Sequence, residues 1–234
     1  MPKKPFTLQE AVRALRRLYG PPAAPPTRNP FELVLWENVA YLPKPGQRSA
    51  AFAMLEKTVG LSPPAILRAK RDLLEAVAAH GILKAKFADK LRECAQIAID
   101  AYGGDLGGAL KGSLTAAKKA LRKFPGIGEP GAEKILLFAG LEPFLAPDSN
   151  ALRVLARLGF IKEEKSYART YANARSAAAQ LRSTISSLKE AHLLLQQHGQ
   201  TLCRLSAPRC EECPLVNRCP WASAHRTIPN TLSR

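Results

Sequence analysis

The sequence has few acidic residues, few aromatic residues and no long apolar run. No apolar segment of the 234-residue chain reaches the ~18 residues that span a bilayer. The first five residues, Met1 to Pro5, do not form the apolar core of a secretory signal peptide. No segment alternates with the two-residue period of a β-strand, and neither internal repeats nor low-complexity tails occur. We therefore expect an all-α protein that is soluble, cytoplasmic and free of membrane contacts.

Cysteine is also scarce, and its distribution is uneven. The chain has five cysteines, an odd number, and four of them lie between residues 203 and 219. A secreted disulfide framework would spread its cysteines along the chain. Cys203, Cys210, Cys213 and Cys219 follow the spacing C-x6-C-x2-C-x5-C. Four thiolates in a tight loop suit tetrahedral zinc or an iron–sulfur cluster, and a single C-x2-C flanked by longer gaps favours Fe4S4 over zinc. The fifth cysteine, Cys94, fits an inert core position.

Positive charge is abundant. Lysine and arginine total 35 against 19 acidic residues, which gives a formal net charge of +16. This excess on a chain with globular composition indicates a polyanionic partner, most simply DNA or RNA. The alternative is a solvated basic surface without a specific partner.

The apolar spacing predicts a series of helices. Thr7 and Glu10 form a capping box that opens a helix with Ala11, Leu15 and Leu18 on one face. A proline-rich linker follows from Gly20 to Pro30. Further helices are expected at residues 31–42, 48–59, 64–80, 87–102, 149–159, 167–182 and 188–199, with an irregular glycine-rich segment at residues 103–112.

A helix–turn–helix segment stands out between residues 116 and 150. A helix at residues 116–123 is followed by a tight turn, Pro125 to Gly128, and a second helix opens near Pro130. Two glycines let the backbone approach another molecule, and the N–H groups of the second helix favour a phosphate. Positive charge surrounds this turn, supplied by Lys118, Lys119, Arg122 and Lys123.

Isolated acids offer candidates for chemistry. Asp148 directly precedes a helix, so it is either a helix N-cap or a reactive carboxylate acting on bound nucleic acid. The nearly apolar helix at residues 31–42 carries Glu32, Glu37 and Asn38, polar residues that need partners or a cavity.

Taken together, these motifs resemble the endonuclease III branch of the helix-hairpin-helix DNA glycosylases. The resemblance rests on Phe124 to Gly128, on Asp148 about twenty residues later, and on the cysteine spacing, and it covers roughly residues 31–220. Similar residues also occur at His192, at His198 to Cys203, and at Gly81 to Ala88.

The resemblance implies two helical domains with DNA between them. Residues 30–144 would form a six-helix domain with the hairpin, and residues 1–29 with 145–234 would form the cluster domain. The four clustered cysteines would hold Fe4S4. It also implies a nucleoid-associated, monomeric base-excision repair enzyme acting on double-stranded DNA with a damaged, mispaired or abasic site.

One departure from the family concerns the chemistry. Family members that also cleave the DNA backbone carry a lysine two residues after the hairpin's second glycine, and here that position is Pro130. Proline within a chain has no free amine, so Schiff-base chemistry is excluded at that position. Lys134, one turn later, is an alternative lysine. The segment from Asp148 to Arg157 looks more like that of the adenine-specific mismatch glycosylases, which are monofunctional, and the substrate base stays open.

The resemblance also assigns expected roles. Asp148 would stabilise a cationic sugar or activate water, and Glu37 or Glu32 would assist departure of the base. The expected base pocket comprises Trp36, Asn38 and Tyr41, with the alternative that Trp36 is core and Glu37 pairs with a basic residue. The expected DNA contacts are Gly126, Ile127, Gly128, Lys118, Lys119, Lys123, the wedge Ile82 and Leu83, Lys84, Lys86, Arg204 and Arg209. A catalytically silent DNA-binding protein and a lyase using another lysine remain competing interpretations.

Overall fold

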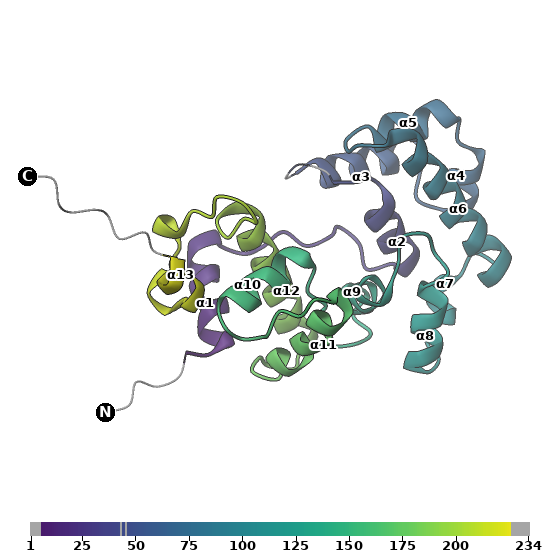
Figure 1. Ribbon diagram of the computed structural model, residues 1–234. Coiled ribbons are helices and arrows are strands. Elements are labelled where there is room, and N and C mark those ends of the chain that lie inside the picture. Colours follow the sequence, from purple (N-terminus) through teal and green to yellow (C-terminus); the bar gives the residue numbers. More distant parts are fainter. Residues whose placement is uncertain (1–5, 43, 45, 226–234) are drawn as a thin grey trace, which may run out of the picture. The chain divides into compact units, whose positions relative to one another are not determined.

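The computed structural model describes residues 6–42, 44 and 46–225, and this part of the chain is helical throughout (Figure 1). No strand occurs among these residues; an isolated antiparallel bridge pairs Tyr41 with Ile82. The chain divides into two compact units, one of residues 25–142 and one of residues 1–24 with 143–234. The domain limits expected from the sequence, at residues 30 and 144, remain a prediction. None of the described helices is long and apolar enough to cross a membrane.

The unit of residues 25–142 contains the hairpin. Its helices are α2 (Pro30–Asn38), α3 (Gln47–Thr58), α4 (Pro63–Arg68), α5 (Arg71–Ala78), α6 (Lys84–Tyr102), α7 (Leu106–Ala109), α8 (Leu114–Leu121) and α9 (Glu129–Ala139). Helix α6 packs against α4 and α5, and α2 packs against α6 and α9. Leu35, Leu91 and Leu136 are fully buried in this core.

Three expectations for this unit need correction. Helix α2 begins at Pro30, after an Asn29 cap, and ends at Asn38, four residues before the end of the helix predicted at residues 31–42. The helix predicted at residues 64–80 is two helices, because Ala69 and Lys70 are extended; Arg92 donates a hydrogen bond to the Ala69 carbonyl. The segment predicted to be irregular contains the single-turn helix α7, which the Asp105 side chain caps.

The other unit contains the cysteines. Its elements are α1 (Leu8–Tyr19), α10 (Ser149–Arg157), α11 (Tyr167–Ala178), α12 (Ile185–Thr201), the 3-10 turns η1 (Cys210–Glu212) and η2 (Val216–Arg218), and α13 (Pro220–His225). Helix α12 packs against α10 and α1. The predicted capping box is confirmed, with reciprocal hydrogen bonds between Thr7 and Glu10. Leu18 is 45% exposed, so the predicted apolar face of α1 ends at Leu15.

Helices α10 and α12 approach each other closely at Gly199. A β-carbon at this position would lie 2.6 Å from the backbone oxygen of Asn150 and 2.8 Å from its β-carbon. Real β-carbons essentially never make such short contacts, so glycine is what allows this spacing. The close approach sets the position of the first turn of α10, where Asp148 lies.

Candidate functional site

The predicted hairpin is formed by α8, α9 and the turn between them. Gly126 adopts φ +76°, a left-handed conformation that favours glycine. Gly128 is the N-cap of α9 and, as a glycine, has no side chain with which to cap the first N–H groups of the helix. Ile127 is buried, and its side chain packs against Gly131, where an added β-carbon would lie 3.4 Å from it. This packing holds the turn against α9. The turn therefore presents backbone N–H groups, as an anion-binding turn requires.

The lysines predicted around the hairpin have different surroundings. Lys118 Nζ lies 2.7 Å from Glu129 Oε1 and 2.6 Å from Glu133 Oε1, and Glu133 is only 2% exposed. Burial by itself lowers the pKa of Lys118, but hydrogen bonds to these two carboxylates outweigh it and raise that pKa. Lys119 and Lys123 are exposed. Lys118 thus joins α8 to α9, and the exposed lysines are better placed for phosphates.

Sequence reasoning missed Lys90. A β-carbon on Gly126 would lie 3.4 Å from Lys90 Nζ and 3.3 Å from Asn38 Oδ1, so α6 brings an ammonium group against the hairpin turn. Lys90 Nζ also lies 4.4 Å above the ring of Phe87. Phe87 and Lys90 lie one turn apart on a predicted helix, and this spacing was the signal in the sequence that could have indicated their contact.

Of the two candidates for a second carboxylate, Glu37 is ion-paired. Its Oε2 lies 2.5 Å from Lys134 Nζ, and its Oε1 lies 3.7 Å from Arg48 Nη1. Trp36 packs edge-on against Phe52, with ring centroids 5.4 Å apart. These contacts match the alternative in which Glu37 pairs with a basic residue and Trp36 belongs to the core.

Glu32, the other candidate, has a local role. Its side chain lies in the first turn of α2 and accepts a hydrogen bond from the Thr27 hydroxyl. A carboxylate in the first turn also stabilises the positive end of the helix. In the structure, Glu32 therefore stabilises the first turn of α2 and binds Thr27, while Asn29 caps the helix.

The remaining residues of the predicted pocket and wedge lie close to the hairpin in the same unit. Asn38 is buried and donates a 3.1 Å hydrogen bond to the Val34 carbonyl. Tyr41 stacks on Phe87, with centroids 5.1 Å apart and planes 15° apart. The predicted wedge and its flanking cations are exposed: Ile82, Leu83, Lys84 and Lys86.

Asp148 lies in the other unit, at the N-terminus of α10. Its Oδ1 accepts a 2.8 Å hydrogen bond from the Ala151 N–H, and Oδ2 accepts one of 2.8 Å from Gln196 Nε2. Asn150 Nδ2 lies 3.3 Å from Oδ2. Burial raises the pKa of Asp148, but the hydrogen bond from Gln196, the N–H of Ala151 and the nearby His192 lower it below its ordinary value. Asp148 is therefore both a helix cap and a firmly ionised carboxylate.

Arg153 connects this carboxylate's surroundings to the cysteine segment. Its Nη2 donates hydrogen bonds to Asn150 Oδ1 at 2.9 Å and to the Gly199 carbonyl at 2.7 Å, and its Nε donates to the Cys203 carbonyl at 2.9 Å. One guanidinium thus joins α10, α12 and the start of the cysteine loop. The contacts with Gly199 and Cys203 were not predictable from the sequence, because both partners are backbone carbonyls more than forty residues away in the chain.

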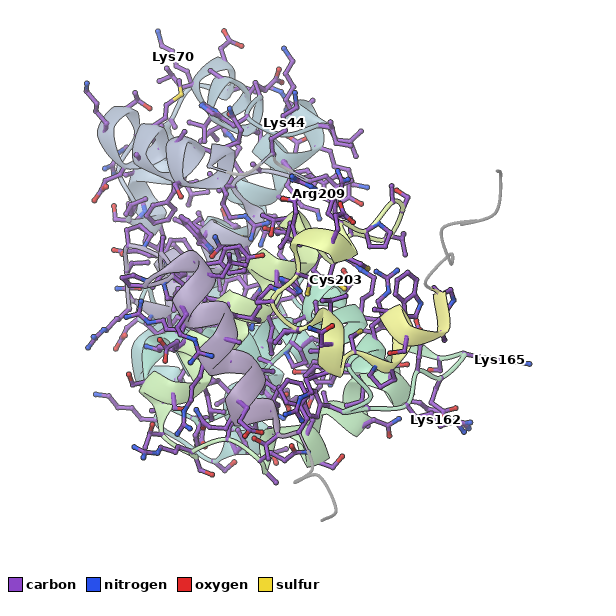
Figure 2. All side chains as sticks on the ribbon, turned by 90° about the vertical axis from the view of Figure 1, so that its left-hand side faces the viewer. Lys44, Lys70, Lys162, Lys165, Cys203 and Arg209 are labelled. Carbon is purple, nitrogen blue, oxygen red and sulfur yellow. The ribbon has the colours of Figure 1, made fainter. Side chains whose placement is uncertain are left out.

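The four clustered cysteines line one cavity, together with Arg157 and His198. Figure 2 shows Cys203 and Arg209 on this C-terminal segment. Leu215 N–H and Ala222 N–H point at the sulfurs of Cys213 and Cys219, at 3.4 and 3.5 Å, and Arg157 Nη1 lies 3.5 Å from the Cys203 sulfur. Hydrogen-bond donors directed at sulfur are the surroundings that a metal-bound thiolate needs. The donor set fits the expected cluster.

Two thiols of this cavity have a raised pKa, which favours their protonated form. Burial raises the pKa of Cys213 to about 11, and burial also raises that of Cys210. Within the described residues, no three His, Cys, Asp or Glu side chains converge on one metal-ion position. A bound cationic group would replace the thiol protons, because thiolate is the form that binds metals.

The two arginines predicted to contact DNA from the cysteine loop are partly engaged. Arg209 forms a two-point ion pair with Glu212, with Nε 2.5 Å from Oε1 and Nη2 2.6 Å from Oε2. Arg204 is exposed and donates to the Ala207 carbonyl at 3.0 Å. The charge of Arg209 is thus compensated within its own turn.

The fold and these sites define an all-α helix-hairpin-helix protein with a four-cysteine cavity, and the chain is similar in sequence to known DNA-repair proteins. An endonuclease III from Thermotoga maritima is 27% identical over 161 residues, 68% of this chain and 68% of that protein. A thymine/uracil-DNA glycosylase from Pyrobaculum aerophilum is 30% identical over 107 residues, 45% of this chain and 46% of that protein. No family model matches the chain.

A solved structure agrees with these relatives in fold. The trapped endonuclease III–DNA covalent intermediate matches with a TM-score of 0.73 at 20% identity, over 94% of this chain and 98% of that chain. The chain is therefore similar in sequence to endonuclease III and thymine/uracil-DNA glycosylase, and it has the endonuclease III fold.

Proposed function

We propose that this protein is a monofunctional DNA N-glycosylase of base-excision repair. It hydrolyses the bond between a damaged or mispaired base and C1′ of its sugar, after the nucleotide has turned out of duplex DNA. The observation that carries this proposal is an ionised Asp148, held by Gln196 and the first turn of α10, in a chain that has Pro130 at the lysine position of the hairpin.

Asp148 suits a step in which positive charge develops on the sugar. Cleavage of the C1′–N bond passes through an oxocarbenium-like sugar, which a nearby carboxylate stabilises. The lowered pKa of Asp148 keeps the carboxylate charged at neutral pH. Its remaining lone pairs can also orient the water that adds to C1′, and its hydrogen bonds keep the carboxylate in place while charge forms.

A Schiff-base lyase step has little support from the lysines near the hairpin. Pro130 has no amine, and Lys134 is held in an ion pair with Glu37. An ammonium in an ion pair has no lone pair with which to attack C1′. Glu37 is itself ion-paired with Lys134 and Arg48. It would assist departure of the base only after bound DNA has displaced one of these two partners.

The DNA contacts follow from the hairpin and its cations. The N–H groups of Gly126 and Gly128 would bind one backbone phosphate, whereas the Ile127 N–H donates to the Phe124 carbonyl at 3.2 Å. Lys90 and Lys123 would add charge beside that phosphate. Turning a nucleotide out costs a few kcal/mol, and less for a mispaired or damaged base. The expected partner is therefore double-stranded DNA with such a site, bound by a monomer in the nucleoid.

The cysteine cavity would hold an Fe4S4 cluster through Cys203, Cys210, Cys213 and Cys219. The single C-x2-C flanked by longer gaps favours a multi-atom cluster over zinc, and all four cysteines line one cavity. When bound, the cluster would act as a rigid crosslink of residues 203–219. Iron, zinc and acid-labile sulfide analyses of the purified protein test this: stoichiometric zinc without sulfide would contradict it.

A panel of duplexes, each with one damaged or mispaired base, tests the activity. We expect wild type to release at least one base, and Asp148→Asn to release it at least about a hundredfold more slowly. Asp105→Asn is the matched control, because Asp105 also caps a helix, α7, through its side chain. Both variants keep a side-chain oxygen for the cap.

Three outcomes separate the competing interpretations. Release of no base by wild type favours a catalytically silent DNA-binding protein, in which Asp148 is only a cap. Equal slowing in both variants would mean that capping explains the effect of Asp148→Asn. Borohydride trapping on an abasic duplex tests for lyase activity, and a covalent adduct with wild type would contradict the monofunctional assignment.

A further inference from the structure

A line of hydrogen-bonding groups runs from α1 to the cysteine cavity. The hydroxyl of Tyr19, the last residue of α1, lies 2.9 Å from Nδ1 of His198 and 2.8 Å from Oγ1 of Thr201, both on α12. The other ring nitrogen of His198, Nε2, lies 3.5 Å from the sulfur of Cys213. One imidazole therefore connects the phenol of Tyr19 to one of the four clustered cysteines.

His198 is placed where the position of its ring hydrogen matters. Its side chain lines the cysteine cavity and is only 1% exposed. Burial disfavours the charged form of an imidazole. A neutral imidazole has one N–H and one bare nitrogen, so the group at one nitrogen determines whether the other donates or accepts. The tautomer of His198 thus depends on the group at Nδ1, which is the Tyr19 hydroxyl.

The direction of donation follows from the chemistry of a metal-bound sulfur. A thiol can donate its proton to Nε2, but a metal-bound thiolate has none, so Nε2 must then carry the hydrogen. The bare Nδ1 would in turn accept a hydrogen bond from Tyr19. The Thr201 hydroxyl, which also lies 2.8 Å from the Gln197 carbonyl, can donate to the Tyr19 oxygen. Donation from Thr201 to Tyr19, from Tyr19 to His198 and from His198 to Cys213 gives every group a matching partner.

A second donor already points at the same sulfur. The Leu215 N–H lies 3.4 Å from the sulfur of Cys213. This donor belongs to the backbone, so it remains when side chains are changed. The Nε2–H of His198 would add a donor that substitution can remove, and its effect on the sulfur can therefore be measured separately.

Resting on the proposed Fe4S4 cluster, we propose that His198 donates a hydrogen bond from Nε2 to the Cys213 thiolate and that Tyr19 is the positioning residue that selects this tautomer. Hydrogen bonds to the ligand sulfurs help to set the reduction potential of an iron–sulfur cluster. They stabilise the more negatively charged, reduced form and so raise the potential. Groups that hydrogen-bond to ligands also strengthen metal binding. Helix α1 would thus influence a cofactor bound near the other end of the sequence.

The first test measures the reduction potential of the full, cluster-loaded chain by voltammetry. Tyr19→Phe removes the hydroxyl and keeps the ring, whereas His198→Leu removes the donor itself. We expect both variants to have a lower potential than wild type. Tyr102→Phe is the matched control, because the Tyr102 hydroxyl donates to the Ala120 carbonyl in the other unit, and it should have the wild-type potential.

Either single variant can contradict the proposal. A wild-type potential in Tyr19→Phe, with the fold confirmed by circular dichroism, would show that Tyr19 does not select the tautomer. A wild-type potential in His198→Leu would overturn the hydrogen bond to Cys213. Because Tyr19→Phe deletes one oxygen in a half-buried side chain, it keeps the test decisive if His198→Leu does not fold.

His198→Gln distinguishes a hydrogen bond from packing. The glutamine amide is a donor in every rotamer that faces the sulfur through nitrogen, and it has no tautomer to select. We expect His198→Gln to restore the wild-type potential, and Tyr19→Phe to cause no further change when combined with it. If His198→Gln has the same lowered potential as His198→Leu, the imidazole acts through packing and the proposal is wrong.

The rate of cluster loss provides a second measurement. Visible absorbance of the loaded protein is followed after addition of an iron chelator. We expect the cluster to be lost about 10- to 100-fold faster from His198→Leu than from wild type. His198→Gln and Tyr102→Phe should lose it at close to the wild-type rate. Equal rates in all four proteins would contradict a stabilising hydrogen bond.

The outcomes separate this inference from the proposals on which it depends. If wild type contains no iron and no acid-labile sulfide, the cluster assignment fails and this inference fails with it. If wild type contains the cluster and all variants share one potential, the hydrogen bond alone is refuted. Base release from the lesion panel tests the glycosylase proposal independently of both results.

Discussion

Gly199→Ala should separate α10 from α12 and disturb Asp148 without touching it. The added β-carbon would lie 2.6 Å from the backbone oxygen of Asn150, and the two helices must separate until this distance reaches 3.4 Å, where ordinary van der Waals contact begins. Both atoms against it are backbone or β-carbon, so no flexible side chain can give way. Overpacking of this kind costs about 1–3 kcal/mol.

Two hydrogen bonds should weaken together with the packing. Arg153 Nη2 donates to the Gly199 carbonyl, and Gln196, one turn earlier on α12, donates to Asp148. Moving α12 away therefore lengthens the bond that lowers the pKa of Asp148. We expect a fall in Tm of roughly 2–12 °C, and a fall in base release greater than the unfolded fraction explains.

Thermal unfolding by circular dichroism, with base release measured at 25 °C, checks this prediction. Gly112→Ala is the matched control, since its β-carbon would lie 3.9 Å from Ala116 and should change stability by at most about 1 kcal/mol. If Gly199→Ala unfolds at the same temperature as Gly112→Ala, the two helices tolerate separation, and the close approach does not position Asp148.

Three further predictions concern single charges. Folding lowers the pKa of Asp148, so its ionised form stabilises the folded state above the unfolded pKa of 3.8. That stability is lost as the pH falls through the folded pKa. Acid unfolding, followed by fluorescence, should therefore be less steep below pH 3.8 in Asp148→Asn than in wild type. Pro130→Lys restores an amine at the hairpin, and borohydride trapping on an abasic duplex should then give an adduct that wild type lacks; absence of the adduct would show that position alone is insufficient. Arg209→Ala should leave the salt dependence of DNA affinity nearly unchanged because Glu212 already neutralises that charge, whereas Lys84→Ala should reduce the slope by about 0.9; equal effects in filter binding would contradict this.

Local chemistry was predictable where neighbouring residues determine it. The capping box of Thr7 and Glu10 and the turn at Gly126 depend on residues within one or two turns of each other, and both are found as expected. The break at Ala69 was not predictable, because neither glycine nor proline marks it. Arg92, more than twenty residues later, satisfies the carbonyl there.

The charges of the candidate site were harder to predict than its backbone. A lysine beside a phosphate-binding turn reads as a DNA contact, yet Lys118 is taken up by Glu129 and Glu133. Arg209 is likewise held in an ion pair, with Glu212. Lys90 was overlooked because its place against Gly126 arises from helix packing. Whether a cation is paired with a carboxylate depends on its neighbours in the folded structure, and the periodic pattern of the sequence does not reveal those neighbours.

The cysteine-bearing unit is built from both ends of the sequence, with a complete second unit between its parts. During synthesis, α1 leaves the ribosome before α12, its packing partner. At roughly 5–20 residues per second, synthesis of the intervening chain takes on the order of ten to forty seconds. Its apolar side chains Leu8, Val12 and Leu15 lack their native cover during that interval. The ribosome thus delivers the whole hairpin unit before the four-thiol cavity can close.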